Sequence, residues 1–201
     1  MNPVYLQFGL AMCLVVGLAL AGTAYLAAAF NRRGKTDLRQ RLEPLAAVVA
    51  GEADVDEATV RGHHDGQIAI ARVANAPGGF GRLFHVELVD AVGGRAWEWS
   101  NLPVKGQAEP NRVFEGDAAL RERLGLDFAA LAAAVPQANT QRWGFLYDPA
   151  AGMVRLSREM RTRLDIPDAA QFAAQLDALA RIGAANRRAQ QDPDAAGDAH
   201  G

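Results

Sequence analysis

The charged side chains divide the chain into two unlike parts. No Asp, Glu, Lys or Arg occurs before Arg32, and residues 4–30 are almost entirely apolar. With a rise of about 1.5 Å per residue, a helix over that stretch is about 40 Å long, which exceeds the ~30 Å hydrocarbon core of a bilayer. Aromatic residues near both ends, Tyr5 and Phe8 at one and Tyr25 and Phe30 at the other, suit the membrane interface. The pattern predicts a transmembrane anchor over residues 1–31.

A basic cluster follows the apolar segment and predicts the orientation of the chain. It consists of Arg32, Arg33, Lys35, Arg39 and Arg41. Because positive residues stay on the cytoplasmic side, we expect the N-terminus outside and the rest of the chain in the cytoplasm. A cleaved signal peptide is the alternative, but it needs a basic leader and a shorter apolar core. Abundant Ala, and Arg far in excess of Lys, are typical of a GC-rich bacterium, so we expect the bacterial inner (cytoplasmic) membrane.

Small residues recur every four positions within the apolar segment, at Gly9, Cys13, Gly17 and Ala21. Such a stripe lets a second helix approach closely and predicts self-association or docking on another membrane protein. In a segment this rich in Ala and Gly, the same spacing also arises by chance.

Beyond the anchor, the pattern changes from a continuous apolar run to short alternating segments. A helix capped by Asp37 is expected from Leu38, with Pro44 kinking it or starting a second helix. Alternation predicts one hairpin from residues 59–62 and 67–73, and a second from residues 83–89 and 95–99. In the second, Trp97 and Trp99 share a face. The acidic stretch from Gly51 to Glu57, between this helix and the first hairpin, is read as a break.

The second half of the chain predicts helices flanking another hairpin. Residues 102–116 read as a linker, and a helix over 118–135 is expected to divide at Gly125. Residues 143–147 and 153–156 form a further predicted hairpin, and an amphipathic helix beginning near Pro167 ends near residue 183. The polar tail from 184 to 201 is expected to be disordered.

These elements predict an α+β fold: one N-terminal transmembrane helix, then a mostly antiparallel sheet (four strands, a helix, two strands) packed with helices. The expected division is an anchor at 1–31, a juxtamembrane basic segment and helix at 32–57, a soluble domain at 58–183 and a tail at 184–201. The 201 residues carry 21 Lys and Arg against 23 Asp and Glu, with Cys13 as the only cysteine. Composition therefore argues against a disulfide scaffold, and the net charge of -2 argues against nucleic-acid binding.

Candidate chemistry is sparse. Imidazole and carboxylate groups could bind a metal at His63, His64 and Asp65, with His85 approaching from a neighbouring hairpin, but a plain polar hairpin tip explains the same residues. Neither Ser100 nor Ser157 lies in a nucleophile motif, and no Gly-rich stretch has the context of a cofactor loop, so no cofactor is expected.

Two further groups of residues could form interaction surfaces. One is the arginine cluster formed by Arg155, Arg158, Arg161 and Arg163, which could meet anionic lipid or an acidic partner, or could simply be a solvated face. The other is the pair Trp97 and Trp99, which either packs in the core or, if left uncovered, forms a partner patch.

The sequence thus predicts a single-pass membrane protein whose cytoplasmic domain is a non-enzymatic protein-interaction or scaffold domain. The alternative is a membrane-tethered enzyme or ligand sensor with a pocket between sheet and helices. A converged polar cluster in a concave pocket would favour the alternative, and a flat apolar patch near the Trp strand would favour the scaffold.

Overall fold

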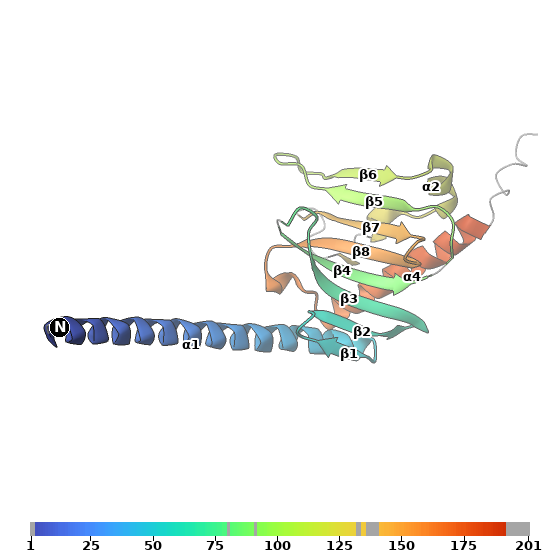
Figure 1. Ribbon diagram of the computed structural model, residues 1–201. Coiled ribbons are helices and arrows are strands. Elements are labelled where there is room, and N and C mark those ends of the chain that lie inside the picture. Colours follow the sequence, from blue (N-terminus) through green and yellow to red (C-terminus); the bar gives the residue numbers. More distant parts are fainter. Residues whose placement is uncertain (1–2, 80, 91, 132–133, 136–140, 192–201) are drawn as a thin grey trace, which may run out of the picture. The chain divides into compact units, whose positions relative to one another are not determined.

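A computed structural model of the chain describes residues 3–79, 81–90, 92–131, 134–135 and 141–191. The chain forms two compact units, residues 1–40 and residues 41–201. The first is helical and the second is built on an antiparallel sheet with further helices (Figure 1), so the predicted α+β class is confirmed.

The N-terminal helix α1 runs from Pro3 to Val48. Its stretch from Ala11 onward has a mean hydropathy of 2.0 in its most apolar window, and none of that window is buried. By length and composition it is able to cross a membrane. The expected new helix start at Leu38 is wrong, because α1 continues through Pro44 without interruption. Leu42 and Leu45, on either side of this proline, are fully buried, and their packing outweighs the local cost of the missing N–H.

The second unit contains an eight-stranded antiparallel sheet in the described part of the chain. The strands, in chain order, are β1 (Glu52–Asp54), β2 (Thr59–His64), β3 (Gln67–Asn75), β4 (Arg82–Val89), β5 (Trp97–Leu102), β6 (Asn111–Glu115), β7 (Trp143–Asp148) and β8 (Met153–Met160). Their order across the sheet is β1-β2-β3-β4-β8-β7-β5-β6.

Two of the expected hairpins are confirmed and one is wrong. Strand β2 pairs with β3, and β7 pairs with β8. The expected pairing of β4 with β5 does not form: β4 lies between β3 and β8, whereas β5 lies between β7 and β6. The late hairpin β7-β8 inserts between them, a long-range pairing that no local turn signal encodes. Strands β1 and β6 form where the sequence predicts a break and a linker, so these two expectations are wrong.

One face of the sheet, the helix-covered face, carries the core. Alternation places Phe84, Val86 and Leu88 of β4 on this face, all buried. Helix α4 (Ala169–Gln191) lies behind the sheet in Figure 1 and contacts β4 and β8. Its apolar side, the end of α1 and the residue after α1 supply further buried residues, namely Leu42, Leu45, Val49, Phe172, Leu176, Leu179 and Ile182.

Two short helices complete this layer. The expected division near Gly125 is confirmed: α2 (Ala118–Leu124) ends with Gly125 in the left-handed conformation, and α3 (Phe128–Leu131) follows. Asp117 caps α2 by accepting a hydrogen bond from Ala119 N–H, which lowers the pKa of the Asp117 carboxyl.

The expected disorder from residue 184 is wrong for residues 184–191, because α4 continues to Gln191. Small residues allow its last turns to pack closely, so Ala185 and Ala189 are buried although no large apolar side chain signals this. The rest of the expected tail lies outside the described residues.

Candidate functional site

The second face of the sheet, here called the polar face, carries an unusual number of buried polar groups. Register places Thr59, Arg61, Ile70, Arg72, His85, Glu87, Glu98, Ser100, Arg155 and Ser157 on it. These positions alternate with the core positions, because successive side chains in a strand point to opposite faces. Glu87 is 3% exposed and His85 is 7% exposed, so polar groups here have left bulk water.

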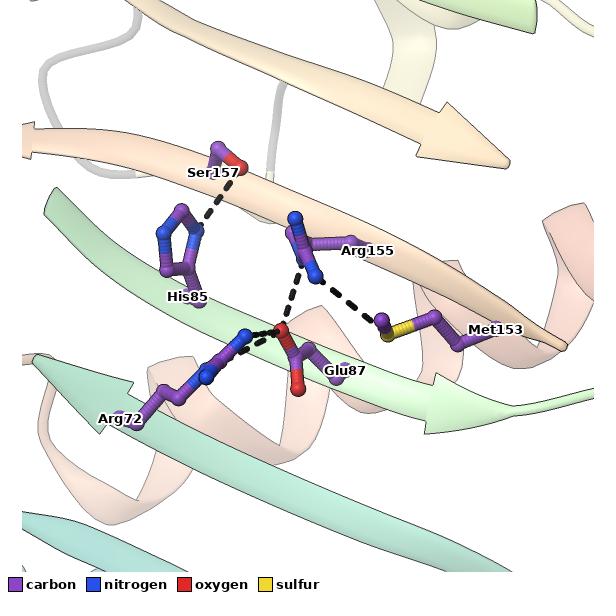
Figure 2. Close-up of polar contacts among 6 residues, drawn as sticks. All are labelled: Arg72, His85, Glu87, Met153, Arg155 and Ser157. Carbon is purple, nitrogen blue, oxygen red and sulfur yellow. Dashed lines mark hydrogen bonds and ion pairs between the residues drawn. The ribbon is translucent and has the colours of Figure 1, made fainter. Parts of the chain in front are cut away.

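An Arg-Glu-Arg cluster lies at the centre of this face (Figure 2). The Glu87 Oε1 atom accepts hydrogen bonds from Arg72 Nε and Nη2 at 3.2 and 2.8 Å and from Arg155 Nε at 2.7 Å. The three residues come from the neighbouring strands β3, β4 and β8, and Glu87 stands directly opposite Arg155. Two guanidinium groups thus share one buried carboxylate, and the cluster carries a net positive charge.

His85 lies beside this cluster, and its pKa depends on burial and on the neighbouring charges. The His85 Nδ1 atom is 2.9 Å from the Ser157 Oγ atom across β4 and β8 (Figure 2). Burial, followed by the positive charge of Arg155, lowers the His85 pKa from 6.5 to about 4, although Glu87 opposes the shift. The imidazole is therefore neutral near pH 7. With so low a pKa it is a weak general base, so the contact with Ser157 is better suited to holding the face together than to activating a nucleophile.

A pocket with a volume of about 270 Å³ opens on the polar face next to the cluster. Its polar lining comes from Glu57, Thr59, Arg61, Arg72 and Glu87, and its apolar lining includes Ile70 and Ala74. Pockets of about 300 Å³ and above are usual for small ligands, so this one suits a small polar molecule. The pocket lies on the exposed side of β2, β3 and β4, not between the sheet and the helices as the sensor alternative expected.

Of the residues predicted as metal ligands, the structure brings only His64 and Asp65 near each other, with His64 Nε2 3.8 Å from Asp65 Oδ2. His63 and His64 are neighbours in β2 and point to opposite faces, and His64 Nε2 contacts Asp177 Oδ1 of α4 at 3.1 Å. His85 lies on the polar face, opposite to His64. Among the described residues, no group of three or more His, Cys, Asp or Glu side chains could hold a metal ion. The four candidate residues, with Asp65 in the hairpin turn, are therefore not brought to one point in this part of the chain.

The four arginines that the sequence groups together between residues 155 and 163 do not form one basic surface. Arg155 belongs to the polar face, whereas Arg158 lies three residues further along β8 and points to the helix-covered face, where it is 3% exposed. Burial lowers the Arg158 pKa, and its guanidinium donates to the Asp165 carbonyl oxygen. Arg161 and Arg163 are exposed beyond the strand. Their closeness in sequence therefore groups residues from two opposite faces of β8 with residues beyond the end of that strand.

The tryptophans are part of the core, so the alternative of an exposed Trp97 and Trp99 patch is wrong. Trp97 and Trp99 are 2% and 4% exposed. The Trp99 ring stacks on Phe128 of α3 with centroids 5.3 Å apart, and Trp97 Nε1 donates to Asn186 Oδ1 of α4 at 2.9 Å. Helices α3 and α4 cover this face and leave no apolar surface at these two residues.

The remaining predicted residues lie on α1. Cys13 is exposed, and Gly17 has no neighbouring side chain within 4 Å of an added Cβ. Gly9 and Ala21 occupy the same helix, as do the basic residues from Arg32 to Arg41. Helix association and membrane orientation stay predictions.

Sequence reasoning missed the Arg72, Glu87 and Arg155 cluster. The available signal was a charge alternating with large apolar residues in residues 83–89, which places Glu87 on the face opposite the core. Its partners come from β3 and β8, and the pairing of β4 with β8 joins residues far apart in the sequence.

Comparison with known protein families, with characterised proteins and with solved structures finds no match to this chain. Any functional conclusion therefore rests on the residues and their geometry.

Proposed function

We infer that this protein is a single-pass membrane protein whose α+β domain is a non-enzymatic ligand-binding module, a sensor held at the membrane by α1. The polar face of its sheet is the binding surface. We place the domain on the cytoplasmic side of the bacterial inner membrane, because the basic residues after the apolar segment favour that orientation.

The observation that carries this proposal is the Arg72, Glu87 and Arg155 cluster beside a pocket. A buried, shared carboxylate fixes both guanidinium groups in place before any ligand arrives, and such preorganised donors bind small polar ligands at low entropic cost. Burial of Trp97 and Trp99 removes the apolar patch that would have favoured the scaffold interpretation.

A protein partner is the second candidate, and two features favour it. Ile68 of β3 is 48% exposed on the polar face, and β6 is paired only with β5 in the described sheet. An edge strand offers unpaired backbone groups to an added strand. A scaffold role, with self-association through α1, would use these surfaces instead of the pocket.

Native mass spectrometry of the full chain, purified from its own membranes in mild detergent, separates the two candidates. We expect a small molecule to copurify, chemically unchanged, and to be lost from an Ala74→Trp variant, in which the indole fills the pocket. Ala170→Trp, at an exposed position on α4, is the matched control and retains the ligand. A ligand-free wild type that carries a stoichiometric protein instead would overturn the sensor proposal in favour of the scaffold.

A further inference from the structure

We propose that the pocket on the polar face binds a small zwitterion, an α-amino acid with a small aliphatic side chain. This rests on the proposed function, because it names the ligand class of the same pocket. The lining supplies both charges on separate elements: Arg61 and Arg72 from β2 and β3, and Glu57 and Glu87 from the turn before β2 and from β4. An α-amino acid carries the two complementary charges at close spacing.

The arginines provide the carboxylate-binding side. Arg72 uses Nε and Nη2 for Glu87, and its side chain remains 42% exposed, so further donors face the pocket. Arg61 is exposed and, within the described part of the chain, its side chain forms no ion pair, although Glu52 stands directly across from it in β1. Guanidinium groups bind carboxylates with strong, geometrically specific hydrogen bonds.

The glutamates provide the ammonium-binding side. All three hydrogen bonds to Glu87 converge on Oε1, and no described residue donates to Oε2, which Figure 2 shows without a dashed line. Although Glu87 is 3% exposed, its Oε2 atom is not among the fully buried atoms that lack a partner, and Glu87 lines the pocket. The Glu57 side chain likewise has no hydrogen-bond or ion-pair partner among the described residues. A simple anion would leave both acceptors unused and would face two nearby carboxylates.

The volume of the pocket and its apolar lining indicate which side chain the bound amino acid carries. A volume of about 270 Å³ lies just below the usual range for small-molecule pockets and matches a compact ligand. Ile70 and Ala74 provide an apolar wall, so a methyl or isopropyl group fits better than a long charged chain. Thr59, a buried residue, adds one neutral polar group to the lining, and its hydroxyl donates to the Glu57 carbonyl oxygen at 3.1 Å.

The test is a titration of the full chain in lipid nanodiscs with L-alanine, L-valine, acetate and methylammonium, followed by calorimetry and by thermal unfolding. We expect saturable binding of at least one of the two amino acids and, at equal concentration, none of acetate or methylammonium. Arg61→Gln and Glu57→Gln should each weaken amino-acid binding about tenfold, because each removes one charged contact from an exposed side chain. Arg181→Gln, at an exposed position on α4, should bind like the wild type.

Three results would overturn the assignment. Acetate binding as well as the amino acids, with Glu57→Gln unchanged, would make this an anion site. Methylammonium binding alone would make it a cation site. If neither amino acid binds, the zwitterion assignment is wrong, and the ligand recovered with native protein then decides separately whether the domain is a sensor at all.

Discussion

Replacing Glu87 with Gln keeps the shape of the side chain but removes the negative charge that Arg72 and Arg155 share. Both arginines then face each other across a neutral amide. Removing one partner of a buried ion pair costs about 3–5 kcal/mol, because the remaining charge is left uncompensated. Arg72 is 42% exposed and Arg155 18% exposed, so water screens part of that cost. We therefore expect Glu87→Gln to lower the free energy of unfolding by about 3 kcal/mol.

Urea unfolding of the full chain in detergent measures this loss. The buried rings of Trp97, Trp99 and Trp143 make tryptophan fluorescence a direct reporter of the domain. Glu159→Gln is the matched control: Glu159 lies on β8 on the same face, its side chain forms no ion pair among the described residues, and its loss should change stability by less than about 0.5 kcal/mol. If Glu87→Gln is as stable as this control, the cluster does not hold the face.

A variant that replaces the whole cluster with apolar residues tests the cause of the loss. In the combination Arg72→Met, Glu87→Leu and Arg155→Met, no charge remains unpaired, and buried ion pairs replaced in this way often cost little or nothing. We expect this triple variant to be more stable than Glu87→Gln. The opposite order would show that the hydrogen bonds themselves, not charge balance, stabilise the polar face.

Four other features give predictions of their own. Gly62→Ala should destabilise the domain by about 1–3 kcal/mol in the same urea assay, because the added Cβ would lie 2.3 Å from the Val49 carbonyl oxygen; unchanged stability would refute this close approach. The unfolded chain protonates His85 near pH 6.5 but the folded chain only near pH 4, so stability should fall as the pH drops from 6.5 to 4, by about 2 kcal/mol, and His85→Gln should remove this part of the pH dependence. Gly17→Ile should reduce helix association in a membrane crosslinking assay, and equal crosslinking in both proteins would exclude the small-residue stripe. Reporter fusions at the C-terminus should be active only with a cytoplasmic reporter, and activity of a periplasmic one would reverse the orientation.

Local patterns predicted the elements of this fold better than their pairing. Alternation in residues 83–89 placed Phe84, Val86 and Leu88 on one face, and the Asp148 to Gly152 turn predicted the β7-β8 hairpin. The insertion of that hairpin between β4 and β5 could not be predicted, because it depends on contacts between distant segments. Short strands such as β1 carry too few residues for a period to emerge.

The candidate site shows the same limit. Alternation places Glu87 on the polar face, but its burial and its two arginine partners depend on which strands lie beside β4. Conversely, the spacing of Arg155 and Arg158 looked like one surface, although a strand puts residues three apart on opposite faces. A strand assignment that reached Met160 would have separated them.

The burial of Leu42, Leu45 and Val49 determines where this protein can be cut. Cleavage between the apolar segment and Arg41 would release a fragment with every one of these side chains still in place. Cleavage a few residues beyond Val49 would instead leave them on the membrane stub and open a gap beside Gly62, against which Val49 packs. A fragment for biochemistry should therefore begin before Arg41 and not at residue 58, because only the longer fragment keeps these buried side chains together with the sheet.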